Sequence, residues 1–416
     1  MYQSIDVFNV PLCQSIDIIM EFIQEKFYQK YKNTSTKIVR EFVGSIDWDN
    51  RLIGIKGSRG VGKTTLILQY IKLHYKELSK VLYVSLDNLY FMQNTLYGLA
   101  DDFHKQGGEF LAIDEVHKYE NWAIEIKNIY DDMPNLKIVF TGSSLLHLHQ
   151  AKADLSRRAV MYSMPGLSFR EYLMFELKED FATYTLAEII HNHTAIALEI
   201  SSKIKPLEYY NDYLNHGYYP FYLENKKSYA QKLSEIVLTI LEVDIVQFAN
   251  IQTSNLGYLK KLLAIISNSV PFKPNMNSLS QRTGISLNTM KLYLKLLHDA
   301  ELLQLLYVEG KGINSLNKPE KIYLGNTNLV YSQGGIHPNI GNIRETFFFN
   351  QLSTKYKVEA SKQADFLVDE IYTFEVGGKN KATSQITGLS NAFIVKDNLE
   401  IGAGNSIPLW LFGFLY

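Results

Sequence analysis

A glycine-rich stretch constrains the fold of this 416-residue chain more than any other feature. The segment GSRGVGKT, from Gly57 to Thr64, matches the pattern GxxxxGK[ST] in full. It follows the apolar run LIGIK and precedes TTLILQYIKLHY, whose apolar residues have helical spacing. A strand, a turn and a helix in this order wrap backbone amides and the helix N-terminus around phosphate groups. The stretch therefore predicts a nucleoside triphosphate site in an α/β domain, and we call it the P-loop.

Each part of the P-loop has a predicted role. Lys63 reaches the β and γ oxygens of ATP, and the Thr64 hydroxyl ligates Mg2+. A glycine turn that happens to precede a helix is the alternative, but the complete pattern in this context favours the phosphate site. The predicted nucleotide-binding residues are Gly57, Ser58, Arg59, Gly60, Val61, Gly62, Lys63, Thr64 and Thr65.

The run EFLAIDE ends in two adjacent carboxylates and predicts the second half of the site. We expect Asp114 to hold Mg2+ through water and Glu115 to polarise the attacking water, so the pair predicts hydrolysis as well as binding. A solvated turn is the alternative. Next comes VFTGSS, where Thr141 or Ser143 is placed to contact the γ-phosphate or the water. A hydroxyl N-cap for the following helix explains these two residues equally well.

Apolar runs alternate with helical periodicity and predict the fold class. Strand-like runs occupy 52–56, 81–86, 109–114, 136–141 and 159–164. This alternation predicts an α/β chain with a parallel P-loop sheet that has helices on both faces. The predicted domains are an N-terminal helical cap at 1–44, the P-loop core at 45–165, a helical region at 166–250, a helix-turn-helix region at 251–335 and a small α/β domain at 336–416.

Composition limits the classes of partner. Hydrophobic residues make up 46% and charged residues 20%, with a net charge of -1, so nothing in the overall balance demands a polyanion or a membrane. The single Cys13 excludes an internal disulfide and a cysteine-based zinc site. There is no secretory leader pattern and no apolar run of about 18 residues. We therefore expect a cytoplasmic protein with no membrane partner, and we expect the final PLWLFGFLY to form a buried strand.

Two arginines precede the last strand-like run of the predicted sheet. Arg157 or Arg158 could reach the γ-phosphate of a neighbouring subunit and stabilise charge in the transition state, which would make the protein a homo-oligomer. A surface pair is the alternative. The segments GSRGVGKTT, AIDEVHKYENW, FTGSS and RRAVMYSMPGLSFREYL, in this order and spacing, resemble prokaryotic AAA-type ATPases that carry a C-terminal domain of unknown function. In that family the arginine usually follows a glycine, so the resemblance favours Arg158, although Arg157 replaces the glycine here.

The segment SLSQRTGISLNTMKLYLKLLHDAELL, residues 278–303, predicts a helix, a turn at Gly284, a second helix and an apolar strand. This is the order of a winged helix-turn-helix, which the AAA-type resemblance also implies at this place. Met290, Leu294 and Leu297 would pack inward. The outward positions, which are the candidate DNA contacts, are Asn288, Lys291 and Lys295. Because only two lysines face outward, a protein-docking or purely structural winged helix is the alternative.

The last region resembles the restriction-endonuclease-like nuclease core. In that core, carboxylates from adjacent strands hold a metal ion and a lysine positions water. The resemblance implies that Glu345, Asp365 and Glu375 are the acids. The family pattern has its lysine two residues after the last acid, but here that position is Gly377, and Lys379 arrives two residues later. This departure favours a nuclease scaffold kept for interaction over a live nuclease.

Together these features predict a magnesium-dependent ATPase of the AAA type. Its nucleotide state would reposition a winged helix and a nuclease-like tail. The predicted cofactors are ATP and Mg2+, and the predicted partner is DNA or a protein. The alternative is an ATP-dependent DNA-processing enzyme with an active C-terminal metal-dependent nuclease.

Overall fold

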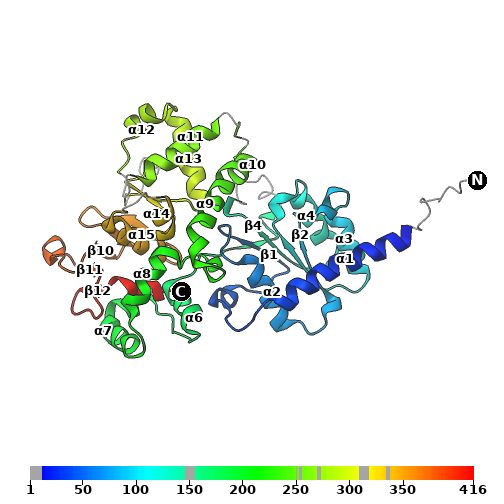
Figure 1. Cartoon of the computed structure of the whole chain (residues 1–416), viewed down its shortest axis with the longest axis horizontal. Coiled ribbons are helices and arrows are strands. Elements are labelled where there is room, and N and C mark those ends of the chain that lie inside the picture. The colour runs from blue at the N-terminus through cyan, green and yellow to red at the C-terminus, as the bar shows by residue number, and fades with distance from the viewer. Residues whose placement is uncertain are drawn as a thin grey trace, which may run out of the picture. The chain divides into compact units, whose positions relative to one another are not determined.

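The structure is a computed structural model of the chain. It describes residues 12–145, 155–249, 251–252, 255–268, 273–308, 318–333 and 338–416. The chain forms two compact units, coloured along the sequence in Figure 1. The first comprises Met1–Lys56 and Lys63–Ser163, and the second comprises Gly57–Gly62 and Met164–Tyr416. Within the described ranges, no helix combines the length and the apolar character that crossing a membrane requires.

A five-stranded parallel sheet forms the centre of the first unit. Its strands are β1 Leu52–Lys56, β2 Val81–Ser85, β3 Phe110–Asp114, β4 Lys137–Gly142 and β5 Val160–Ser163. They lie in the order β2-β3-β4-β1-β5, and every neighbouring pair is parallel. Strands β1 to β4 are almost wholly buried, which explains their continuous apolar runs. The predicted fold class is confirmed, and each predicted strand lies within one residue of its observed ends.

Helices cover both faces of this sheet. They are α1 Leu12–Asn33, α2 Lys63–His74, α3 Leu96–Lys105 and α4 Trp122–Asp132, with the 3-10 turns η1 Glu41–Ser45, η2 Leu78–Lys80, η3 Leu89–Met92 and η4 Val116–Lys118. Figure 1 shows α1 and α2 on one side of the strands and α3 and α4 on the other. The strand order explains this arrangement. The chain runs across the sheet in one direction from β1 to β2 and in the opposite direction from β2 to β3 and β4. Because each crossover between parallel strands is right-handed, the helices of the two directions lie on opposite faces.

After Met164, the second unit continues with a series of helices. Its helices are α6 Phe169–Leu177, α7 Leu186–Lys203, α8 Pro206–His216, α9 Tyr229–Thr239 and α10 Ile245–Ala249, with the 3-10 turns η6 Pro220–Leu223 and η7 Lys226–Ser228 and the π-helical turn η8 Ile240–Asp244. Capping boxes start α6 at Ser168 and α7 at Thr185, because each hydroxyl accepts the amide three residues later.

Three helices and a hairpin follow. They are α11 Leu256–Ser267, α12 Met276–Thr283, α13 Leu287–Asp299, and the antiparallel strands β6 Leu303–Leu306 and β7 Lys321–Leu324. Gly284, with a φ of +80°, ends α12, and the Ser286 side chain caps α13. Glycine suits this position because other residues rarely adopt a left-handed backbone. Helix α14 Thr327–Gln333 follows β7.

The chain ends in a second five-stranded sheet next to helix α15 Ile340–Ser353. The strands are β8 Val358–Ala360, β9 Phe366–Val368, β10 Tyr372–Gly377, β11 Ala392–Lys396 and β12 Ser406–Pro408, with the 3-10 turn η11 Thr383–Ile386 between β10 and β11. Their order is β12-β11-β10-β9-β8. Strands β8, β9 and β10 pair antiparallel, whereas β10, β11 and β12 pair parallel.

The prediction that PLWLFGFLY forms a strand is wrong. Strand β12 ends at Pro408, and Leu409–Phe414 forms the 3-10 helix η12. Every residue of this helix is buried, so its sequence has neither the period of a strand nor that of a helix. Gly413 lies so close to Phe169 that an added Cβ would be 2.4 Å from the Phe169 Cβ. The prediction that this segment is buried is therefore correct, whereas the prediction of its backbone conformation is not.

Candidate functional site

The P-loop turns the chain from β1 into α2. Gly60 has a φ of +87° and Gly62 a φ of +99°, backbone conformations that glycine adopts without strain. Lys63 is the first residue of α2 and is buried, Thr64 follows it, and Thr65 is exposed. The amides of a first helical turn have no partner within the helix, which makes them donors for an anion. The predicted nucleotide-binding residues thus lie in a turn and a helix start, where the Ser58 amide donates to Glu301 Oε2 over 3.2 Å.

Asp114, at the end of β3, is the centre of a group of hydroxyl donors. The Thr64 hydroxyl donates to Asp114 Oδ2 over 2.6 Å, although the two residues are 50 positions apart. The Thr141 hydroxyl donates to the other carboxylate oxygen, Oδ1. They meet because the carboxyl ends of parallel strands lie at one edge of the sheet. A hydroxyl and a carboxylate are oxygen ligands that suit Mg2+, so the donor set fits the ion that the sequence implies.

Tyr83 is part of this site and was missed by the sequence analysis. Its hydroxyl donates to Asp114 Oδ2 over 2.6 Å, and the Lys30 ammonium of α1 donates to the Tyr83 oxygen over 3.2 Å. Burial raises the pKa of Tyr83 far above its ordinary value and the Asp114 charge raises it further, so the phenol stays a proton donor. In the sequence, Tyr83 is one apolar position of a buried strand, and only the pairing of β2 with β3 brings it to Asp114.

Glu115 has an uncommon backbone conformation. Its φ is 54° and its ψ is 42°, the left-handed region, which non-glycine residues enter mostly where the surrounding structure holds them. Its amide donates to the Thr141 hydroxyl over 3.2 Å, and its carboxylate oxygen Oε2 lies 3.4 Å from Nε2 of His117. Asp114 is the last residue of β3, and Glu115 is the residue at which the chain turns from this strand into η4.

Thr141 and Ser143 lie in different surroundings. Thr141 is buried, and its hydroxyl accepts from the Glu115 amide while it donates to Asp114. It therefore links the two acids. The Ser143 hydroxyl accepts the Leu145 amide over 3.3 Å, which is the local bond expected of a helix-starting serine. Of the two residues, Thr141 is the one in contact with the predicted metal ligand.

Arg158 is tied to its own unit. Its guanidinium donates to both carboxylate oxygens of Asp131, in the last turn of α4, over 2.9 Å each. Hydrogen bonding to Arg158 is the main cause of the lowered pKa of Asp131. Arg157, by contrast, is exposed. To reach the phosphate of a neighbouring subunit, Arg158 would have to leave a bidentate partner, which is a strong type of ion pair.

The candidate DNA contacts lie on the outer face of α13. Asn288, Lys291 and Lys295 are exposed, and Lys295 pairs with Asp299 of the same helix over 2.9 Å. The inward positions predicted for this helix, Met290, Leu294 and Leu297, are buried.

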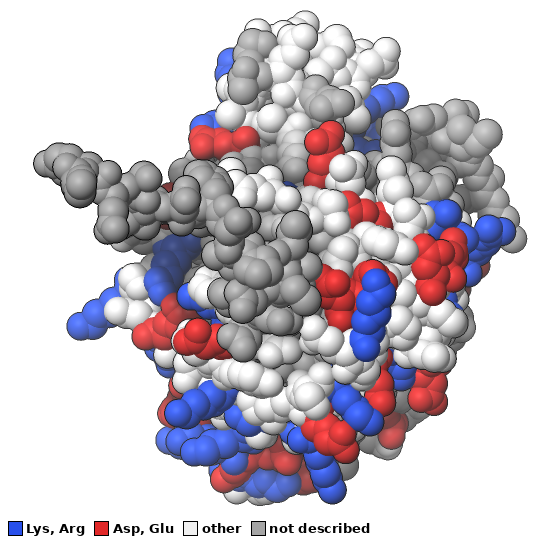
Figure 2. All heavy atoms as spheres, turned by 90° about the vertical axis from the view of Figure 1, so that its right-hand side faces the viewer, with Lys and Arg blue, Asp and Glu red and all other residues white. Residues whose placement is uncertain are grey.

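The face of the molecule in Figure 2 carries charges of both signs. There, lysine and arginine side chains are interspersed with aspartate and glutamate side chains. Interspersed charges do not produce the long-range field that attracts a polyanion. Contact with nucleic acid on this face would therefore depend on a few residues, as the net charge of the chain also indicates.

The three acids that the sequence singles out in the C-terminal region each have a lysine partner. Glu345 of α15 and Asp365, just before β9, both pair with Lys321 over 2.9 Å, and Glu375 of β10 pairs with Lys381 over 2.6 Å. Lys379 is exposed. We call Glu345, Asp365 and Glu375 the acidic cluster. Among the described residues, no group of three or more His, Cys, Asp or Glu could hold a metal ion.

Residues 49–173 match the family described as an AAA domain. The match covers the P-loop, the two acids after it and Arg158, and it supports a nucleotide-dependent ATPase of the AAA type. Residues 207–339 match a domain of unknown function, DUF8612. No curated protein matches the chain.

Solved structures give weaker comparisons. ORC1 from Aeropyrum pernix in complex with DNA is 11% identical, covers 74% of this chain and 91% of its own, and has a TM-score of 0.31. AMPPCP-bound DnaA from Aquifex aeolicus is 16% identical, covers 64% and 92%, and has a TM-score of 0.29. TM-scores this low carry no function over to this chain.

Proposed function

We propose that this chain is a magnesium-dependent ATPase of the AAA type that acts as a nucleotide-dependent switch on a DNA or protein partner. The observation that carries the proposal is the 2.6 Å hydrogen bond between Thr64 and Asp114. It joins the end of the P-loop to the end of β3, the two places from which Mg2+ is held in enzymes of this kind.

Each group of residues in the site has its own role in the proposed hydrolysis. The P-loop amides and Lys63 bind the phosphate oxygens, and Thr64 and Asp114 would hold Mg2+, whose charge offsets that of the phosphates. Glu115 accepts a proton from the attacking water. The water oxygen then bonds to the γ-phosphorus, the bond from that phosphorus to the bridging oxygen breaks, and ADP leaves.

The variant Glu115→Gln tests the hydrolytic role. It keeps the shape of the side chain and removes the proton acceptor, so ATP should still bind while turnover falls about 100-fold or more. Glu120→Gln is the matched control, because Glu120 lies five residues later and is exposed. Turnover by Glu115→Gln equal to that of Glu120→Gln would place the base elsewhere.

The partner is tested by measuring ATP turnover with and without DNA. A DNA partner predicts that DNA changes turnover and that Lys291→Ala with Asn288→Ala weakens the effect. A protein partner predicts turnover that DNA leaves unchanged.

A nuclease is the second candidate, and one observation favours it. Asp365 and Glu375 line a common cavity of about 490 Å3, which is open to solutes. We expect no cleavage of single- or double-stranded DNA above that of a Glu375→Ala control, with either Mg2+ or Mn2+. Cleavage that disappears in Glu375→Ala would make the nuclease the leading proposal.

A further inference from the structure

Lys321 stands at the centre of the acidic cluster, although it belongs to another part of the chain. It is the first residue of β7, in the hairpin after α13. Its ammonium lies 2.9 Å from Glu345 Oε2 and 2.9 Å from Asp365 Oδ1, and its side chain is only 13% exposed. Two residues later, the Tyr323 hydroxyl donates to the same Glu345 oxygen over 2.6 Å. One face of β7 thus supplies two donors to the cluster.

Backbone contacts hold β7 in this place. The Ala360 amide of β8 donates to the Tyr307 carbonyl, just after β6, over 2.7 Å. A bridge between Val308 and Ala360 extends the contact. Since β6 pairs with β7 throughout, the hairpin is joined to the edge of the C-terminal sheet. The position of Lys321 is therefore set by main-chain bonds as well as by its own charge.

Lys321 occupies the oxygens that a metal ion would need. Asp365 Oδ1 accepts from Lys321, and Asp365 Oδ2 accepts from the Val376 amide over 3.1 Å. Burial pulls the pKa of Lys321 down, but the charges of Glu345 and Asp365 outweigh burial and raise it overall. The lysine is therefore charged. A divalent cation would have to approach the carboxylate oxygens to about 2.0–2.6 Å, and the ammonium, 2.9 Å from Glu345 Oε2 and from Asp365 Oδ1, blocks that approach.

We propose that the Lys321 ammonium takes the place of a metal ion in the acidic cluster: it offsets part of the charge of Glu345 and Asp365, fastens the β6–β7 hairpin to the C-terminal sheet and keeps divalent metal ions out. The nuclease pattern requires a cation between its acids, and here the chain itself provides it. The inference is independent of the ATPase proposal, because it concerns other residues and needs no nucleotide.

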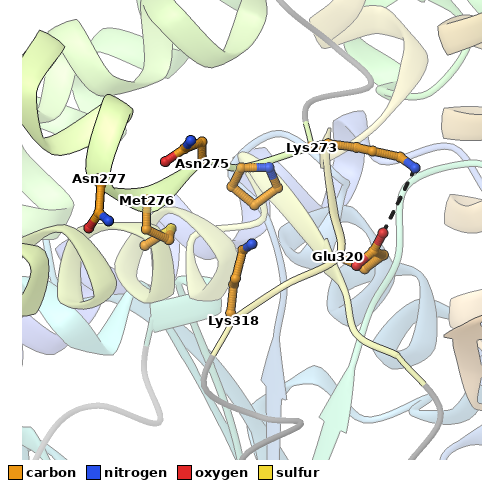
Figure 3. A pocket seen from close by; sticks show the side chains of 7 residues that line it. Lys273, Asn275, Met276, Asn277, Lys318 and Glu320 are labelled. Atoms are coloured by element: carbon orange, nitrogen blue, oxygen red, sulfur yellow. Dashed lines mark ion pairs between the residues drawn. The ribbon is translucent and has the colours of Figure 1, made fainter.

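Solvent access does not explain the exclusion of metal. The cavity that Asp365 and Glu375 line shares Lys273 and Glu320 with a neighbouring cavity of about 520 Å3 at the start of α12. Figure 3 shows this second cavity, with Lys273 and Glu320 paired over 3.8 Å on one side and Lys318 near Met276 on the other. The proposal therefore places the barrier to metal binding in the charge at the cluster and not in the lack of a cavity beside it.

The test is Mn2+ binding to the full chain without nucleotide, followed by electron paramagnetic resonance. Lys321→Met keeps the unbranched apolar part of the side chain and removes its charged end. It should gain a Mn2+ site at least tenfold tighter than any in the wild type, and adding Asp365→Asn should abolish the gain. Lys379→Met is the matched control, because Lys379 is exposed, and it should behave like the wild type. Mn2+ binding by the wild type that Asp365→Asn removes would overturn the proposal, as would a folded Lys321→Met without the gain.

If Lys321→Met is too unstable for metal titration, its melting temperature Tm can be compared with that of the double variant instead. Removing the lysine alone leaves two partly buried carboxylates without their cation, so Tm should fall. Removing Asp365 and Lys321 together should restore part of that loss, because fewer charges are left uncompensated. Losses in Tm that simply add would show that Lys321 does not neutralise the cluster. A normal ATPase rate in these variants would leave the nucleotide proposal intact whatever the result.

Discussion

Replacing Tyr83 with phenylalanine tests whether β2 positions the acid that would hold Mg2+. The change deletes one oxygen atom, the donor of the 2.6 Å hydrogen bond to Asp114 Oδ2. The ring remains and can still stack on Phe27, 6.4 Å away between ring centroids. Thr64 and Thr141 still donate to the Asp114 carboxylate. The variant therefore removes the hydrogen bond to Asp114 together with the weaker one, over 3.2 Å, that Lys30 donates to the phenol oxygen.

Two magnitudes follow from this geometry. A hydrogen bond to a charged group contributes about 1.5–3 kcal/mol to folding, and because Asp114 keeps two other donors we expect a loss of about 1.5 kcal/mol. Groups that orient a metal ligand typically affect metal affinity or activity by about 10–100-fold. We therefore expect the Mg2+ concentration for half-maximal ATP turnover to rise about tenfold. ATP binding without Mg2+ should change little, because Lys63 and the P-loop amides are untouched.

The assay is steady-state ATP turnover across a Mg2+ titration at saturating ATP. Tyr97→Phe is the matched control, because the Tyr97 hydroxyl donates to Asp132 over 3.0 Å on the surface. It should leave the Mg2+ dependence unchanged. If Tyr83→Phe and Tyr97→Phe gave the same Mg2+ dependence, the idea that β2 positions Asp114 would be refuted.

Three further predictions concern the P-loop, assembly and pH. Lys63→Ala should abolish tight ATP binding in equilibrium titration, because the phosphates lose a buried cation, and affinity within a few-fold of the wild type would contradict the P-loop assignment. If Arg158 acts on a neighbouring subunit, Arg158→Ala should lower ATP turnover about 1000-fold, and the specific activity of the wild type should rise with protein concentration. Asp131→Asn is the control and should keep normal turnover. A stable monomer whose activity does not depend on concentration would exclude this role. Burial raises the pKa of Glu375 in the folded protein above its ordinary value of 4.5. The protonated carboxyl therefore stabilises the fold fully below pH 4.5, and this stabilisation is lost as the pH rises through the higher pKa of the folded state. Glu375→Gln should remove this decline when Tm is followed from about pH 4 to pH 8, and a parallel decline in both proteins would show that Glu375 does not cause it.

Local patterns in the sequence determined the P-loop and the first sheet. The spacing of glycines before Lys63 and Thr64 specifies a turn and a helix start on its own, because positive φ angles and the amides of a first helical turn are properties of a few adjacent residues. Buried parallel strands are apolar on both faces, so β1 to β4 are visible as short continuous runs. Asp114 and Glu115 were predictable for the same reason, since they directly follow such a run.

Only the tertiary structure decided which distant residues share a site. The order β2-β3-β4-β1-β5 brings Tyr83 and Thr141 to Asp114 from the two neighbouring strands, and no local spacing encodes that order. Likewise, Lys321 reaches Glu345 and Asp365 because the hairpin joins the edge of another sheet. Strand pairing depends on the packing of whole elements, whereas a motif depends on adjacent residues. The P-loop motif is therefore recognisable from the sequence, whereas the hydrogen-bond and ion-pair partners of each acid come from the fold.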